Sequence, residues 1–278
     1  MMEIHALLIN MRRSADRLEY QRRQLDRMGI AFERLEAVDA ADISDREFGG
    51  RSQQWQRPLS RPEVGCFLSH RLAWQRVAEA GRPLLVLEDD AVLSDHLSAV
   101  LAGLTPSVES LIYNLETGRG RKLLSIWPTA SLPLGHSTVK IFRDSGGSAA
   151  YIITPKAAAA CLKRAERHTA PADAFLNAMP RMQIEPGLAV QMEMLAGMLQ
   201  GDLRATAVST MRRASTETSV LRKLVRRPRM KLRRLDSNLQ TAALQVMTLA
   251  RAKKRWVPYC PSIEAKASLM QPQERRAA

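Results

Sequence analysis

Three consecutive carboxylates, Glu88, Asp89 and Asp90, follow the apolar run LLVL at residues 84–87. Negative charges this close repel one another, and burying one of them without a partner costs free energy. A divalent cation relieves both costs, because Mg²⁺ and Mn²⁺ prefer hard oxygen ligands. If strand geometry persists to Asp90, Glu88 and Asp90 point to one face and Asp89 to the other. The stretch therefore indicates either a metal site that also meets phosphate oxygens or the start of a solvated loop.

A second group of polar residues stands earlier in the chain, in the segment INMRRSADR. It has neither the dinucleotide-binding fingerprint nor a phosphate-binding P-loop. It does place Asn10, Arg13 and Arg17 where a strand passes into a helix, and there they could meet a phosphate or a nucleobase. An ordinary solvated helix start explains the same residues equally well.

The segment SRPEVGCFLSHRLAW contains a third set of candidates. Ser60 and Glu63 have the spacing of a capping box, which predicts a helix start. Gly65 lies in the first turn of that helix, where a small residue permits close approach of another backbone or of a ligand. His70 has no second His or Cys at metal-binding spacing, so it is either a packed histidine or a ligand contact. Cys66 is interpreted as a small buried hydrophobe.

Alternating strand and helix signals predict the scaffold for these residues. We expect a mainly parallel sheet with helices on its faces, and in such sheets ligands lie beyond the carboxyl ends of the strands. Residues 40–58 are predicted to be a loop, and residues 117–142 receive no assignment. Strands are expected at 4–9, 31–38, 84–88, 111–116 and 146–154, and helices at 14–29, from 60 to 81, at 94–104 and from 155 onward.

The net charge of +14 is distributed unevenly along the chain. Residues 1–203 contain 24 Lys and Arg against 24 Asp and Glu, whereas residues 204–278 contain 18 against 4. We therefore predict two parts, a balanced catalytic or binding domain at 1–203 and a basic, partly helical region at 204–278 that meets an anionic membrane surface or an acceptor. Three cysteines without regular spacing indicate reduced thiols and a cytoplasmic location.

Several unusual segments then occur in a recognisable order. They are LLINMRRSADRLEYQRRQLDRMGIAFERLEAVDAADIS, LSRPEVGCFLSHRLAW, LLVLEDDAVL, GSAAYIITPKAAAACL, PADAFL and IEPGLAVQ. Together they cover about residues 3–200 and resemble the family 25 glycosyltransferases. That family includes lipooligosaccharide β-1,4-galactosyltransferases and the related collagen galactosyltransferases. EVGCFLSH and LEDD are the most specific of the segments.

The resemblance implies a GT-A-like fold, a UDP-hexose donor and transfer with inversion at the anomeric carbon. Glu88, Asp89 and Asp90 occupy the counterpart of the family's DxD metal motif. The resemblance therefore implies a Mn²⁺ (or Mg²⁺) site that binds the donor diphosphate, with Asp90 as the direct ligand. Such a metal would stabilise the leaving UDP.

Inversion also requires a general base that takes a proton from the acceptor hydroxyl. Asp173, in PADAFL, matches the family's acidic position after the Ala-rich helix, and the resemblance implies that it acts as base or as a partner of the metal. The family often has a second acidic residue where Ala174 stands, so the choice between these roles stays open. Without the resemblance, Asp173 would be interpreted as a helix N-cap.

The remaining site residues follow from the same resemblance. Ser69 and His70 would face the donor, and Gly147, with its neighbour Gly146, would let the backbone approach the sugar, although a turn before a strand explains these glycines almost as well. The nucleotide pocket would be lined by Asn10, Arg13, Arg17 and Asp39.

The resemblance implies transfer of a hexose, most simply galactose, to lipopolysaccharide, lipooligosaccharide or another glycan. We expect a cytoplasmic enzyme held peripherally on the inner face of the membrane by its basic region. Two other classes are considered. A metal-dependent phosphohydrolase could use the same carboxylates. A nucleic-acid-binding protein is disfavoured, because aromatic residues make up only 5% of the chain and residues 1–203 are charge-neutral.

Overall fold

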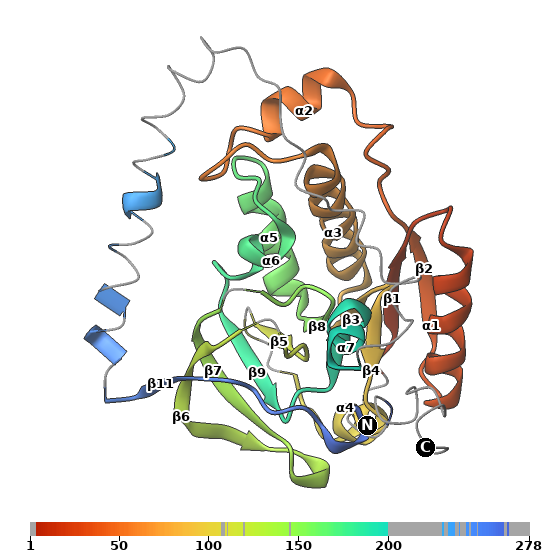
Figure 1. Cartoon of the computed structure of the whole chain (residues 1–278), viewed down its shortest axis with the longest axis vertical. Coiled ribbons are helices and arrows are strands. Elements are labelled where there is room, and N and C mark those ends of the chain that lie inside the picture. The colour runs from red at the N-terminus through yellow and green to blue at the C-terminus, as the bar shows by residue number, and fades with distance from the viewer. Residues whose placement is uncertain are drawn as a thin grey trace, which may run out of the picture.

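The computed structural model describes residues 4–106, 109, 111–118, 120–144, 146–199, 230, 233–236, 239, 243–244, 246–248, 250–263 and 266. Helices and strands alternate through the first half of this part of the chain (Figure 1). In chain order the elements are β1 (Ala6–Asn10), α1 (Ala15–Arg27), β2 (Phe32–Glu36), α2 (Asp45–Arg51), α3 (Arg61–Ala80), β3 (Leu84–Glu88), β4 (Ala91–Leu93), α4 (Leu97–Gly103), β5 (Ile112–Asn114), β6 (Lys122–Ser131), the 3₁₀ helix η1 (Pro133–Gly135), β7 (Ser137–Arg143), β8 (Ala150–Ile153), α5 (Pro155–Ala165), α6 (Ala172–Leu176), β9 (Arg181–Glu185), β10 (Ala189–Gln191), α7 (Met192–Leu199) and β11 (Ala252–Arg255).

The main sheet has nine strands in the order β11-β6-β7-β9-β5-β8-β3-β1-β2. The prediction of an α/β fold is confirmed, but the prediction of a mainly parallel sheet is wrong. Only β1–β2, β1–β3 and β5–β9 pair in parallel, and the other five pairs are antiparallel. Two consecutive strands can pair in parallel only if a long connection, usually a helix, joins them. The described residues of 117–149 contain no α-helix, and only the short η1 separates β6 from β7, so these strands pair antiparallel.

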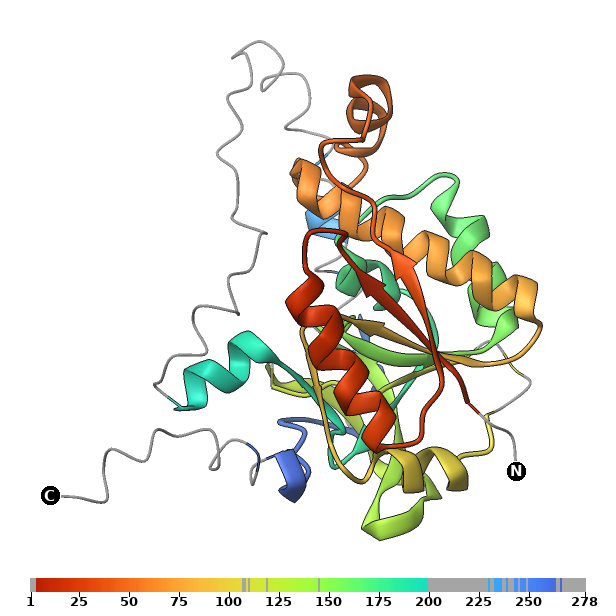
Figure 2. The same cartoon turned by 90° about the vertical axis from the view of Figure 1, so that its right-hand side faces the viewer.

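Strand alternation divides the core into two faces. Leu7, Ile9 and Val86 pack with α3, α5 and α6 on one face of the sheet. Leu8 and Leu87, one residue along, pack with α1 and α4 on the other. Figure 1 shows β1 and β2 between α3 and α1, and the rotated view in Figure 2 agrees. Both faces are covered, so the central strands are apolar on both sides and the charged residues collect where those strands end.

Helix α3 begins as its capping box predicts. The Ser60 hydroxyl accepts from the Glu63 backbone N–H, and the Glu63 carboxylate accepts from the Ser60 N–H. Gly81 ends the helix with φ of 63°. A Cβ on Gly65 would lie 2.9 Å from the Val38 carbonyl oxygen, so the expected close approach of another backbone is observed. The predicted loop at 40–58 is wrong in one respect, because it contains the short helix α2.

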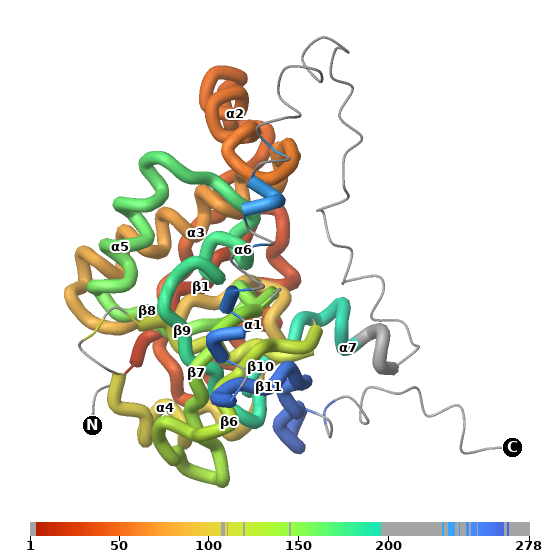
Figure 3. The backbone as a smooth tube through the Cα atoms, turned by 90° about the vertical axis from the view of Figure 1, so that its left-hand side faces the viewer, coloured from red at the N-terminus to blue at the C-terminus, as the bar shows by residue number. Residues whose placement is uncertain are grey.

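The last part of the chain returns to the sheet. Strand β11 pairs antiparallel with β6 and forms one edge of the main sheet, and Val257, Cys260 and Ile263 are buried beyond it. Figure 3 shows the blue tube of β11 beside β6. The folded unit therefore includes residues on both sides of position 203. Most of the first part of the basic, partly helical region predicted at 204–278 lies outside the described residues, although the residues described between 230 and 248 are helical. None of the described helices is long and apolar enough to span a bilayer.

Candidate functional site

The acidic triplet lies at the carboxyl end of β3, beside the end of β1. Strand β3 stops at Glu88, and Asp89 and Asp90 form a turn before β4. Because Ile9 and Glu88 are register partners, Asn10 reaches the same edge, where its Nδ2 donates to Asp89 Oδ2 at 2.8 Å. Arg17, from the first turns of α1, donates to Asp89 Oδ1 at 3.1 Å. The structure thus brings together two predicted nucleotide-pocket residues and one predicted metal ligand.

Asp90 has a different environment. Its Oδ1 is buried and has no hydrogen-bond partner among the described residues. Burial, followed by the negative charges of Glu88, Asp89 and Glu116, raises the pKa of Asp90 to about 8, although Arg17 opposes the shift. Such a carboxyl group needs either a proton or a cation beside it. An orphaned hard oxygen among like charges fits a divalent cation such as Mn²⁺ or Mg²⁺.

Glu88 is held by a chain of buried side chains. The Trp74 indole N–H donates to the Tyr151 hydroxyl at 3.0 Å, and that hydroxyl lies 2.9 Å from His70 Nδ1. Because the Glu88 carboxylate can only accept, the His70 Nε2–H donates to Glu88 Oε1 at 3.2 Å, and Nδ1 of the neutral ring accepts from the Tyr151 hydroxyl. Ser148 donates to the same oxygen at 2.6 Å. The predicted donor-facing His70 is therefore a buried residue that orients Glu88.

Ser69 acts on another loop of the site. Its hydroxyl accepts from the Val38 N–H at 2.9 Å and donates to the Gly65 carbonyl at 2.8 Å. These bonds tie the AVDA segment to α3 and so position Asp39, which forms an ion pair with Arg13. The structure thus brings Arg13 and Asp39 together at the surface. Ser69 affects the position of this pair indirectly, because its hydroxyl binds the backbone of Val38 next to Asp39.

Asp173 lies in α6, and the N-cap of that helix is Pro171 rather than Asp173. Its carboxylate charge acts on two other groups of the site region. Burial, followed by the charges of Glu88, Asp173 and Asp90, raises the pKa of Cys66 well above its usual value. The Asp173 charge also raises the pKa of Arg57, after the larger effect of the ion pair with Glu63. The charges of the predicted base and of two predicted metal ligands thus all act on Cys66, in the first turns of α3.

Gly147 has a structural reason to be glycine. Its φ is 112°, and a Cβ there would lie 2.8 Å from the Asn114 side-chain nitrogen. Asn114 is buried at the end of β5, beside the edge that bears the acidic triplet. The turn explanation therefore accounts for the glycine, and a contact between this backbone and the sugar stays a prediction.

Sequence reasoning missed a buried ionic cluster. Asp144 Oδ2 lies 3.0 Å from Lys122 Nζ and 3.3 Å from Arg181 Nη2, and all three side chains are at most 3% exposed. Lys122 also donates to the Gln183 side-chain oxygen at 2.7 Å and to the Glu116 backbone carbonyl at 3.0 Å. Lys122 and Asp144 lie in and next to strands that the sequence left unassigned. Lys122 and Arg181 each begin a strand, and no sequence pattern links either of them to Asp144.

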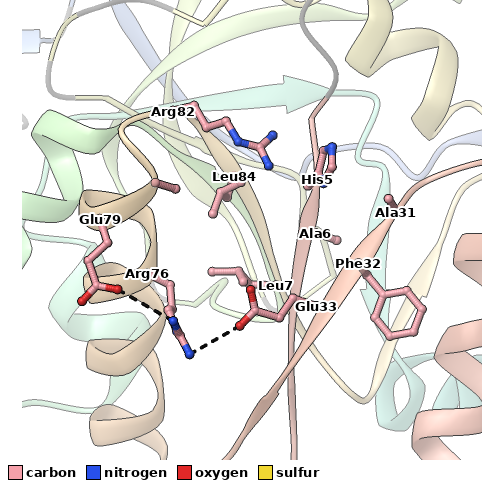
Figure 4. A pocket seen from close by; sticks show the side chains of 11 residues that line it. His5, Ala6, Leu7, Ala31, Phe32, Glu33, Arg76, Glu79, Arg82 and Leu84 are labelled. Carbon is pink, nitrogen blue, oxygen red and sulfur yellow. Dashed lines mark ion pairs between the residues drawn. The ribbon is translucent and has the colours of Figure 1, made fainter.

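A cavity of about 410 Å³ lies away from this site. As Figure 4 shows, it is lined by residues at the beginnings of β1, β2 and β3 and by the end of α3. Arg76 lies there, 3.6 Å from a Glu33 carboxylate oxygen and 3.9 Å from one of Glu79. The acidic triplet lies at the carboxyl end of β3, which runs in the same direction as β1 and β2. The cavity is therefore at the opposite edge of the sheet.

Comparison with known protein families identifies the family of the chain. The model described as "Glycosyltransferase family 25 (LPS biosynthesis protein)" matches residues 3–176. The chain belongs to glycosyltransferase family 25. The predicted resemblance is thereby confirmed, and the matched range includes every predicted site residue from Asn10 to Asp173. The roles of the individual residues stay predictions.

Relatives of this family 25 chain match only in part. Procollagen galactosyltransferase 1 of Danio rerio is 32% identical over 191 residues, which are 62% of this chain and 30% of the relative. Procollagen galactosyltransferase 2 of Homo sapiens is 30% identical over 112 residues, 37% of this chain and 18% of the relative. The chain therefore spans less than a third of either length. A solved inositol-1-phosphate CTP transferase from T. maritima covers 68% of this chain and is itself covered to 89%, at TM-score 0.40 and 10% identity. That likeness is too low to identify a shared fold.

Proposed function

We propose that this chain is an inverting, metal-dependent glycosyltransferase with a GT-A-like catalytic domain. It would transfer a hexose, galactose in the first instance, from a UDP-sugar to lipopolysaccharide, lipooligosaccharide or a related glycan. The observation that supports the proposal best is the buried Asp90 oxygen, which lies among other carboxylates and has no hydrogen-bond partner among the described residues. It belongs to the predicted metal motif, within the range that the family 25 model matches. The family is described by lipopolysaccharide biosynthesis, which supports the acceptor class, and relatives of the chain are galactosyltransferases, which supports the sugar.

The metal would be held by Asp90 directly, with Glu88 as a second ligand, because the Glu88 charge acts on Asp90. When bound, Mn²⁺ or Mg²⁺ would neutralise the donor diphosphate and stabilise the charge that develops on UDP. Asp89 already accepts from Asn10 and Arg17 through its two oxygens, so we assign it the positioning of these two residues. Asp89 would thus hold the Arg17 and Asn10 side chains in a fixed orientation beside the nucleotide before it binds.

Asp173 would act as the general base. Its carboxylate would take the proton of the acceptor hydroxyl while the hydroxyl oxygen forms a bond to the anomeric carbon. The bond from that carbon to the UDP oxygen breaks on the opposite side, which inverts the configuration. The charge effects that Asp173 shares with Asp90 on Cys66 support its presence near the donor edge.

An anionic membrane surface is the proposed location of the acceptor. The described residues at the β6–β11 edge include the exposed side chains Ile126, Trp127 and Trp256, together with Lys253 and Lys254. Exposed tryptophans beside lysines suit the boundary between lipid headgroups and acyl chains. Co-sedimentation should show binding to phosphatidylglycerol vesicles that weakens with salt and with charge reversal of both lysines. Equal binding to phosphatidylcholine vesicles would contradict this part of the proposal.

The catalytic proposal is tested by product formation. The chain is incubated with Mn²⁺, a panel of UDP-sugars and a lipid A–core oligosaccharide preparation, with and without acceptor. We expect transfer from UDP-galactose only with acceptor and metal, and a loss of kcat of roughly 10²–10⁴-fold in Asp173→Asn with unchanged UDP binding. The exposed Asp26→Asn serves as a matched control. UDP release that is indifferent to acceptor would instead support a phosphohydrolase.

A further inference from the structure

A second cluster of metal-binding side chains lies outside the proposed transferase site. His96 stands at the N-cap of α4, His136 follows η1, and Cys260 lies in the chain return after β11. Their ligand atoms all lie within 4.8 Å of one another. His96 Nδ1 is 3.1 Å from His136 Nε2, which is 3.9 Å from Cys260 Sγ. We propose that these three residues bind a zinc ion.

The tautomer of His136 suits this role. Its Nδ1 lies 3.0 Å from the carbonyl oxygen of Pro186, which can only accept, so Nδ1 bears the proton. The lone pair of Nε2 therefore faces the other two residues. A backbone carbonyl that fixes the far nitrogen is the usual support of a zinc-binding histidine. His136 and Cys260 are buried, which holds both ligand atoms in place.

The spacing also suits zinc. Zn–N bonds of about 2.0–2.1 Å and a Zn–S bond of about 2.3 Å in a tetrahedron separate two nitrogens by about 3.3 Å and a nitrogen from a sulfur by about 3.6 Å. The observed 3.1 and 3.9 Å lie close to these values. One thiolate and two imidazoles suit zinc better than Mg²⁺ or Mn²⁺, which prefer oxygen. Three protein ligands leave the fourth position to water.

Neighbouring hydroxyl groups support the sulfur. Ser94 Oγ donates to Cys260 Sγ at 3.0 Å, and Ser262 Oγ lies 3.5 Å from the same sulfur. A hydroxyl that donates to sulfur stabilises the thiolate form needed for metal binding. On binding, Cys260 releases its thiol proton to solvent, and the His96 proton moves from Nδ1 to Nε2, so that Nδ1 can bind the ion.

The site would fasten the chain return to the body of the protein. Backbone bonds already connect this return to the corner after β9, because the Gly187 N–H donates to Pro258 O at 2.8 Å and the Cys260 N–H to Gly187 O at 3.1 Å. Zinc would add a link from Cys260 to α4 and to the segment after η1. The ion is therefore structural in this proposal, and it does not depend on the proposed transferase activity.

The test is a metal analysis of the untagged full chain, loaded with zinc and dialysed against metal-free buffer. We expect about one tightly bound zinc per chain by mass spectrometry, and its loss in Cys260→Ser and in His136→Gln. Cys161→Ala, at a buried cysteine of α5, should keep the ion. Asp90→Asn should keep it too, which separates this site from the acidic triplet.

Cobalt gives a second readout, and its main test uses the wild-type chain. Co²⁺ bound to the wild-type chain should show the near-ultraviolet thiolate charge-transfer absorption and tetrahedral visible bands. His96→Gln, at the half-buried ligand, should weaken both. A wild-type chain that retains no zinc and shows no thiolate–cobalt absorption would overturn the proposal, as would Cys260→Ser binding zinc as tightly as wild type.

Discussion

Replacing Asp90 with asparagine should stabilise the metal-free protein while abolishing its response to metal. The pKa of Asp90 is raised from 3.8 to about 8, so the folded state holds a proton that the unfolded state releases. Stability therefore falls as the pH rises from about 4 to 8, by at most about 1.4 kcal/mol per pH unit, and is constant above 8. Asparagine cannot ionise, so the variant lacks this slope.

The size of the effect follows from the same shift. Between 3.8 and pH 7 there are about three pH units, which set an upper limit of about 4 kcal/mol for the gain in the free energy of unfolding. Asp90 as a whole residue is only half-buried, so water screens part of the repulsion from Glu88, Asp89 and Glu116. We therefore expect a gain on the order of 2 kcal/mol at pH 7 and a smaller gain at pH 5.

Urea unfolding in EDTA at both pH values measures this difference, with the exposed Asp26→Asn as control, which should change stability by less than about 0.5 kcal/mol. Adding Mn²⁺ with UDP should then raise the unfolding midpoint of wild type and leave that of Asp90→Asn unchanged. The difference in stability between the two proteins therefore becomes smaller or changes sign. A variant no more stable than wild type at pH 7 in EDTA, or an equal gain at both pH values, would refute the reasoning.

Three further substitutions probe the scaffold around this site. Asp144→Ala leaves a buried lysine and a buried arginine without their shared carboxylate, and should lower the free energy of unfolding by about 3–5 kcal/mol in urea. Gly147→Ala forces a Cβ against the Asn114 side chain at φ of 112°, and should cost about 1–3 kcal/mol in the same assay. Ser60→Ala removes one half of the capping box, and calorimetry should report a loss of about 1 kcal/mol.

Local signals in the sequence predicted the elements around the site well. The Ser60 cap and the left-handed Gly81 set the ends of α3, and the apolar run before Glu88 is a strand buried on both faces. Such features depend on a few neighbouring residues, so a single sequence reveals them. The position of the acidic triplet at a strand end followed from the same reasoning.

Other features depend on contacts between distant segments. Strand β6 contains Pro128 and shifts register against β7 at three places, so it lacks the regular alternation that marks a strand. Because β6 and β7 were not assigned, the relative directions of the strands in the sheet were predicted wrongly. The chain from Trp74 through Tyr151 and His70 to Glu88 joins residues up to 81 positions apart. Nothing local marks such a chain.

The acidic turn can exist only because the backbone on both sides holds it. Gln21 of α1 donates to the Asp89 carbonyl at 3.1 Å, and the Met192 N–H of α7 donates to the Asp90 carbonyl at 2.9 Å. These bonds fix the turn without using the carboxylate oxygens, so repulsion between the charges cannot be relieved by moving the chain. The ion pair of Arg17 with Asp89 relieves part of the repulsion, and a proton or a cation relieves the rest at Asp90. The segments that hold the turn thus make the site ready for a metal, at a cost in stability that the rest of the fold offsets.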